Sequence, residues 1–191
     1  MKKTALLVLS LLILSVAPAS AQDYRHEVSG FVGAGSLQDI AESFANVFVL
    51  IYSMGYVQED TKTSTPVLGL NYRYHLSRLF SVGGTFNYQQ FKNRYSLLGT
   101  EFLETTTRYF TVMGRFDITY LRFELFQMYS GAAAGICLQN ESSSGFDSNN
   151  HTFFGLQVNL VGLRIGKQLA GILELGFGCN GIAVAGMTYA F

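Results

Sequence analysis

Two side chains in this sequence have types and a spacing that could support hydrolysis. His75 and Ser77 form a His-x-Ser pair, in which a histidine base could activate the serine hydroxyl if a carboxylate oriented the ring. The next acidic residue along the chain is Glu101, and the pair falls in an expected turn. His26 and His151 stand apart from it. We therefore expect no catalytic residues and no metal site.

A second pattern, GFGCNG at Gly176–Gly181, matches the dinucleotide-binding spacing G-x-G-x-x-G. That fingerprint binds a nucleotide only where a strand runs into a helix. Here the glycines lead into a tight Asn-Gly turn and a final strand, so we expect no nucleotide and no other cofactor.

The two cysteines, Cys137 and Cys179, are candidates for a disulfide in an oxidising compartment. Both fall near the same end of their expected strands, with one strand between them. At the usual strand spacing this places their Cα atoms about 10 Å apart, beyond ordinary disulfide reach. The sequence leaves the bridge open.

The elements that must position these residues are β-strands. In residues 65–76, Leu70, Tyr72 and Tyr74 alternate with Asn71 and Arg73 at a period of two. Eight segments can be read this way: residues 25–35, 65–76, 79–91, 107–116, 121–138, 152–166, 170–178 and 182–191. One face of these segments is apolar and aromatic, and the other carries Asn, Gln, Thr, Gly, Arg and Glu.

Composition and the chain's first residues indicate export. Lys2 and Lys3, an apolar run and the small residues Ala19 and Ala21 predict a signal peptide over residues 1–21, leaving residues 22–191 as one domain. The remaining chain carries 11 basic and 13 acidic residues, which does not indicate a nucleic-acid partner. Charged residues make up 14% of the chain, and 16 Phe and 11 Tyr accompany 20 Gly. This composition leaves two options, a soluble secreted β-protein or a membrane-spanning β-barrel.

The connections alternate between long and short, as in outer-membrane barrels with long outer loops and short periplasmic turns. The first long connection, residues 36–64, contains helical spacing over 38–54, with Asp39 placed to cap the start. Residues 44–56 also fit a ninth strand, but this would break the long-short alternation, so the helix is favoured. Its place over the mouth, beside the membrane or inside the lumen stays open.

At this point the chain resembles a known family. The segments YRYHLSRLFSVGGTFNY (72–88) and ELGFGCNGIAVAGMTYAF (174–191) are similar to blocks in the outer-membrane β-barrel domain family, small barrels of the OmpA and OmpX type. The resemblance implies an all-β fold, an eight-stranded antiparallel transmembrane β-barrel with a helical insert in the first extracellular loop. It implies no catalytic residues. The terminal Phe191 resembles the insertion signal read by the outer-membrane assembly machinery.

Alternation places two sets of side chains in this barrel. One set points into the lumen as a charge network: Arg73, Arg115, Arg122, Glu124 and Glu174. The other faces the membrane interface toward one rim of the barrel: Tyr72, Tyr74, Phe80, Phe116, Phe123, Tyr189 and Phe191. A second aromatic belt is expected from Tyr88, Tyr109, Phe110, Phe153 and Phe154. An eight-strand interior is just wide enough for side chains to fill, so the charges predict a plug.

These features predict a non-enzymatic protein of the cell outer membrane with a structural or surface-interaction role. Its expected partners are outer-membrane lipid, lipopolysaccharide and the assembly machinery, and we expect a monomer. A narrow porin-like channel or small-ligand transporter is the alternative. A lipid A-modifying enzyme, suggested by His75 and Ser77, is the least favoured.

Overall fold

The computed structural model describes residues 25–41, 43, 57–97, 100–143 and 149–191. The predicted signal peptide over residues 1–21 lies outside this set, as do residues 44–56, where the helix competed with a ninth strand.

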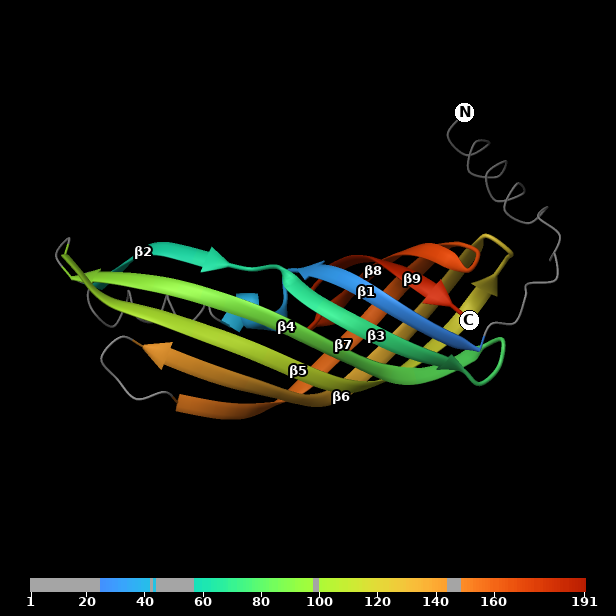
Figure 1. The fold of residues 1–191 in the computed structure, drawn as a ribbon, viewed down its shortest axis with the longest axis horizontal. Helices are drawn as coiled ribbons and strands as arrows, with labels where there is room; N and C mark the ends of the chain where they lie inside the picture. The colour runs from blue at the N-terminus through green and yellow to red at the C-terminus, as the bar shows by residue number, and fades with distance from the viewer. Residues whose placement is uncertain (1–24, 42, 44–56, 98–99, 144–148) are drawn as a thin grey trace, which may run out of the picture.

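The described residues form nine antiparallel β-strands, which close into an eight-strand barrel (Figure 1). They are β1 (His26–Ala34), β2 (Val57–Ser64), β3 (Val67–His75), β4 (Phe80–Leu97), β5 (Thr100–Arg122), β6 (Phe126–Ser143), β7 (Asn149–Gly166), β8 (Leu169–Gly178) and β9 (Ala183–Ala190). Each strand pairs with the next along the chain from β3 to β9, and β1 pairs with both β3 and β9. The predicted all-β class and eight-strand ring are confirmed.

The ninth strand, β2, was not predicted. It continues the line of β3 and pairs with the outer part of β4, from Val57 opposite Leu97 to Ser64 opposite Phe91. Pro66 separates the two strands, since it has no N–H to give to a ladder. The sequence VQEDTKTS lacks apolar alternation, so a strand outside the membrane gives no period-two signal and was taken for part of the loop.

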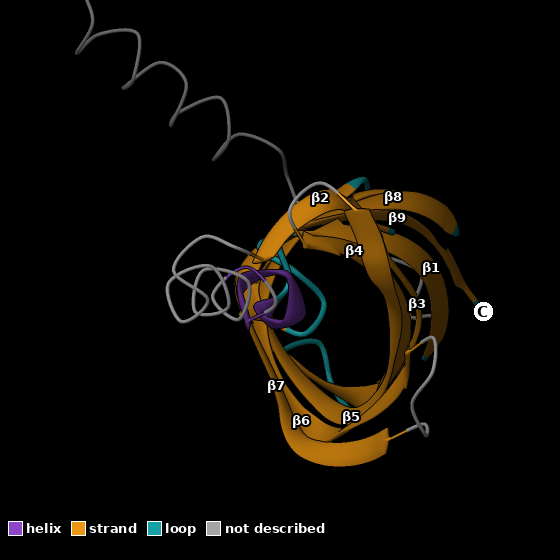
Figure 2. Cartoon of the chain, turned by 90° about the vertical axis from the view of Figure 1, so that its left-hand side faces the viewer, coloured by secondary structure: helices purple, strands orange, loops and turns teal. Residues whose placement is uncertain are grey.

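The helical insert is small in the described residues, which are helical at 37–41 and 43. Asp39 does not cap its start. Ser36 does, since its Oγ accepts from the Asp39 N–H at 3.1 Å, while an Asp39 oxygen accepts from the Ser36 N–H at 2.8 Å. This reciprocal pair is a capping box. The helix begins at the mouth of the ring (Figure 2), where Asp39 bonds Gln89 of β4.

The two faces of the barrel wall are inverted relative to a soluble protein. Leu70, Val112 and Leu160 expose 54–67% of their surface on the outside. Asn71 and Thr111, next to them in sequence, are buried inside. An apolar exterior around a polar interior is the arrangement of a transmembrane β-barrel, so these strands cross a membrane. Separately, no helix in the described part of the chain has the length and apolar character to span one.

Strand length identifies the extracellular end. A membrane-crossing strand needs about 9–11 residues, whereas β4, β6 and β7 have 18 and β5 has 23. The excess lies at one end, where the β4–β5 and β6–β7 hairpins run far past β1 and the β8–β9 turn (Figure 1). We call this extension the outer sheet: β2 with residues 91–97 of β4, 100–107 of β5, 139–143 of β6 and 149–152 of β7. The opposite end has only short turns, as expected for the periplasmic side.

The β8–β9 turn gives the first testable prediction. Gly181 has a φ of 109°, and a Cβ built there would lie 2.5 Å from the Ala34 carbonyl oxygen. We expect Gly181→Ala to destabilise the barrel by about 1–3 kcal/mol, because the residue is held in a conformation that L side chains avoid. Urea unfolding in detergent micelles measures this.

Gly171→Ala is the matched control, since its Cβ would meet nothing closer than 4.0 Å. It should be neutral or slightly stabilising. Equal losses in the two variants would contradict the assignment of the effect to the turn.

Candidate functional site

The periplasmic half of the lumen is organised around one carboxylate. Glu27 of β1 accepts hydrogen bonds at Oε1 from Arg73 (2.8 Å), Arg164 (3.2 Å) and the Thr188 hydroxyl (2.6 Å). Its Oε2 lies 3.1 Å from Nε2 of His75. Glu27 is buried, so these partners replace the water that an ionised carboxylate requires.

A second cluster lies next to it around Glu174 of β8. Arg115 donates to both Glu174 oxygens, at 2.6 and 3.3 Å, and its Nε donates to Asp117 at 2.8 Å. The Tyr129 hydroxyl and the Asn159 amide donate to the same Glu174 carboxylate at 2.6 and 2.9 Å. Two-pronged Arg–carboxylate contacts of this kind are strong and directional.

The Tyr129 ring joins the two clusters. The Arg73 guanidinium carbon lies 4.7 Å from the ring centroid and that of Arg115 lies 5.8 Å from it, within range of cation–π attraction. Arg73 also comes within 4.0 Å of Asp117. We call the combined set the lumen network: Glu27, Arg73, Arg115, Asp117, Tyr129, Arg164 and Glu174. Its three carboxylates balance its three guanidinium groups.

Polar side chains continue from the lumen network toward the mouth. The Asn87 amide donates to Asn180 at 2.7 Å, and Gln157 accepts from the Asn180 backbone N–H at 2.8 Å and donates to Asn159 at 2.8 Å. These bonds fold the β8–β9 turn inward. At the mouth, Ser36 donates to Gln89 at 2.6 Å. Side chains therefore cross the interior at successive levels from the periplasmic half to the mouth.

Of the residues predicted for the lumen charge set, Arg73, Arg115 and Glu174 are buried together, and Arg122 is half-buried at the end of β5. Glu124 is a correction. It is 42% exposed in the β5–β6 turn and pairs with Lys167 of the neighbouring turn. Strand β5 runs on to Arg122 and β6 begins only at Phe126, so Glu124 is not the start of a strand.

Sequence reasoning missed four members of the lumen network. Glu27 alternates with Val28 and could have been assigned from parity. Asp117 was not assigned to the lumen because residues 117–120 were taken as a connection between two strands. Tyr129 was not assigned either. Arg164 lies beyond a β-bulge between Asn159 and Val161, which reverses the parity of β7. A sequence signal existed, since an arginine that faces lipid destabilises a barrel, by up to about 1 kcal/mol near the interface and by more toward the midplane.

The predicted interface aromatics lie at the periplasmic end of the barrel wall. The His26 ring stacks on Phe191 at 5.5 Å and bonds the Tyr72 hydroxyl at 2.8 Å, while Phe80 stacks on Phe116 at 5.8 Å. Tyr189 faces outward beside them, Tyr74 contacts the His26 ring, and Phe123 lies in the β5–β6 turn.

In the second belt, Tyr88 packs against Phe110 on the outside at 5.0 Å, and Phe153 and Phe154 are exposed. Tyr109 is a correction, because it faces inward and packs edge-on against Phe91 in the lumen.

His75 and Ser77 have separate hydrogen-bond partners in the structure. The Ser77 hydroxyl accepts from the backbone N–H groups of Leu79 and Phe80 at 3.2 and 3.1 Å, which is a turn-stabilising role. His75 does have a carboxylate partner, Glu27 from β1, but that carboxylate belongs to the lumen network.

The cysteines are free thiols, and both are buried. Cys137 accepts a hydrogen bond from Thr111 at 3.3 Å and lies 3.6 Å from the Gln38 amide nitrogen of the helical insert. In this structure it therefore helps to seat the helix at the mouth.

Comparison with known proteins supports the fold. No protein-family model matches the chain, and no curated protein matches it. Among solved structures, it is similar to Ail, the attachment invasion locus protein of Yersinia pestis, crystallised with the heparin analogue sucrose octasulfate. The TM-score is 0.52 at 16% identity, covering 89% of this chain and all of that one. A second Ail structure gives a TM-score of 0.48 at the same identity and coverage. The chain has the fold of the small outer-membrane barrels.

Variants of two glutamates compare the contribution of the lumen network to stability with that of a surface ion pair. We expect Glu174→Gln to destabilise the barrel by about 3 kcal/mol, because it leaves the buried Arg115 with an incomplete set of charge partners. Glu124→Gln, the control, breaks only an exposed pair and should cost at most about 1 kcal/mol. Urea midpoints of the two variants give the comparison, and similar losses would contradict a stabilising role for the lumen network.

Proposed function

We propose that this protein is a non-enzymatic surface protein of the outer membrane, with a closed lumen and with the outer sheet as its interaction surface. The observation that carries the proposal is the length of the central strands. The 23 residues of β5 are about twice what a membrane crossing needs. A protein that only filled or sealed the membrane would have no use for the excess.

The lumen supports the closed state. The side chains of Arg115 and Glu174 are each at most 1% exposed and bonded to each other from strands on different sides of the ring. Opening a path would require these groups to separate, and an unpaired buried charge costs about 3–5 kcal/mol. The backbone cannot widen the ring without losing strand pairing. Transport through the lumen is therefore the second candidate.

The outer sheet supports binding at the surface. Lys92 of the outer sheet and Arg108 of β5, one residue before the sheet begins, are exposed on the outward side of the wall, just beyond the packed rings of Tyr88 and Phe110. Cations at this level face the phosphate groups of lipopolysaccharide, and they also suit sulfated glycans, of which Ail has bound an analogue. Polyanionic glycans are accordingly the first ligands to test.

Conductance tests the closed lumen. In planar bilayers the reconstituted protein should give no steady single-channel steps, because paired side chains occupy the lumen. The double variant Arg115→Ala with Glu174→Ala removes both central groups and should give steps if it folds, which heat-modifiable gel migration checks. Steady steps from the unaltered protein, lost in Glu174→Gln, would overturn the closed lumen in favour of a channel.

Trimming the outer sheet tests the interaction surface. Asn93 and Thr105 lie opposite each other, so an Asn-Gly turn can replace residues 94–104 and leave the membrane ring intact. We expect the trimmed protein to fold and to bind immobilised heparin or purified lipopolysaccharide more weakly, because the surface beside Lys92 and Arg108 is removed while these two cations remain. Lys92→Gln with Arg108→Gln, which keeps the full sheet, should weaken binding and its salt dependence. Binding unchanged in both variants would contradict the proposal.

A further inference from the structure

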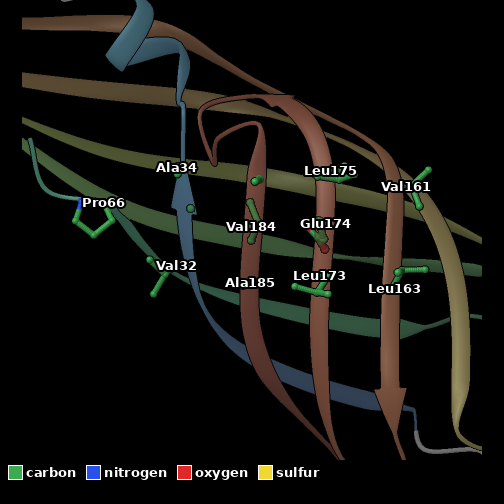
Figure 3. A pocket seen from close by; sticks show the side chains of 12 residues that line it. Val32, Ala34, Pro66, Val161, Leu163, Leu173, Glu174, Leu175, Val184 and Ala185 are labelled. Atoms are coloured by element: carbon green, nitrogen blue, oxygen red, sulfur yellow. The ribbon is translucent and has the colours of Figure 1, made fainter.

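The lipid-facing wall of the barrel carries an apolar groove that the proposed function does not use. Its volume is about 430 Å³, and it lies near the extracellular ends of β1, β9 and β8 and beside Val161 and Leu163 of β7 (Figure 3). Its floor consists of small outward-facing side chains, Ala183 and Ala185 of β9 with Ala34 of β1. Val32 and Pro66 line one side, and Leu173 lines the other.

The groove arises from two features of the sequence. One is that alanines occupy outward-facing positions here, whereas large apolar residues cover the rest of the wall. Along one rung, Leu68, Val32, Ala185 and Leu173 are cross-strand neighbours, and only the residue on β9 is small. The other is Pro66, which lies between the end of β2 and the start of β3. Beyond Val67 opposite Gly33, β1 has no further partner on β3, so the wall is hollowed at that level.

We propose that this groove binds one acyl chain of lipid A from the outer leaflet. The inference rests on the outer-membrane placement of the proposed function but not on the outer sheet. The groove opens onto the membrane in the extracellular half of the barrel, and the hydrocarbon there belongs to lipopolysaccharide. Its lining is almost wholly apolar, as a hydrocarbon chain requires.

Width favours a single chain over a protein partner. Along the rung of Ala185 the floor is one strand wide, so the backbones of β1 and β8 on its two sides are roughly 10 Å apart there. An extended acyl chain fits between side chains at that separation, whereas the convex wall of a second barrel does not enter it.

Packing explains why a chain would stay in the groove. Lipid tails are as apolar as leucine, so no hydrophobic gain separates one lipid-facing site from another. The sites differ instead in van der Waals contact, because a chain in the groove touches protein on its floor and both sides. A chain on the flat part of the wall touches protein on one side only.

Photo-crosslinking tests the proposal. The full-length mature protein in detergent micelles is mixed with lipid A that carries a diazirine in one acyl chain, and adducts are mapped by peptide mass spectrometry. We expect adducts to concentrate on β1, β7, β8 and β9 at the residues that line the groove. Ala185→Leu fills the floor and should lower them several-fold. Ala134→Leu, a lipid-facing alanine on β6 outside the groove, should leave them unchanged.

A parallel sample with diazirine-bearing phosphatidylethanolamine distinguishes the lipid source. Equal, groove-directed labelling by this lipid would overturn the assignment to lipid A. Adducts spread evenly around the barrel, or groove adducts that Ala185→Leu leaves unchanged, would overturn the groove as an acyl-chain site. Loss of heparin or lipopolysaccharide binding after trimming the outer sheet is independent of these outcomes, so the two proposals can fail separately.

Discussion

The pairing of β1 with β9 is the constraint on which the rest of this structure depends. The two strands match from Glu27 opposite Ala190 to Ala34 opposite Ala183, and His26 and Phe191 exchange backbone hydrogen bonds at 3.1 and 2.8 Å. Without this seam, a row of backbone groups would face hydrocarbon, at several kcal/mol for each unsatisfied group. With it, the ring has eight strands, and its interior is just wide enough for side chains to fill.

Filling that interior with charge requires local departures from regular strand geometry, and these gather around Tyr129. Register shifts occur in β5 between Thr119 and Leu121 and in β7 between Asn159 and Val161, on the two neighbours of β6. A Cβ at Gly162, directly opposite Tyr129, would lie 2.3 Å from its ring. The bulge in β7 also turns Arg164 inward to Glu27. One large aromatic side chain thus accounts for a glycine and lies between the bulges, where the two charged clusters meet.

Sequence alternation was sufficient to predict the eight-strand ring and part of its lumen, because parity within an unbroken strand is fixed by the pleat. It placed Arg73, Arg115 and Glu174 inside. It could not place Arg164, whose parity depends on an extra residue that has no sequence signature of its own. It also misassigned Glu124, because the end of one strand and the start of the next were each displaced by a few residues. The strand β2 was not predicted, because a strand surrounded by water rather than lipid needs no apolar face and shows no apolar alternation.

The same rule of backbone satisfaction explains where the ring stops being closed. Strand β8 pairs with β7 only from Gln157 inward, and β3 pairs with β4 only as far as Tyr88. Beyond these points the wall continues as an open sheet, which water can satisfy and lipid cannot. The lipid-facing aromatics Tyr88 and Phe154 lie at those two transitions, where an interfacial belt belongs. Strand pairing and side-chain type therefore place the outer boundary of the membrane at the same level, with the groove just inside it and the outer sheet beyond it.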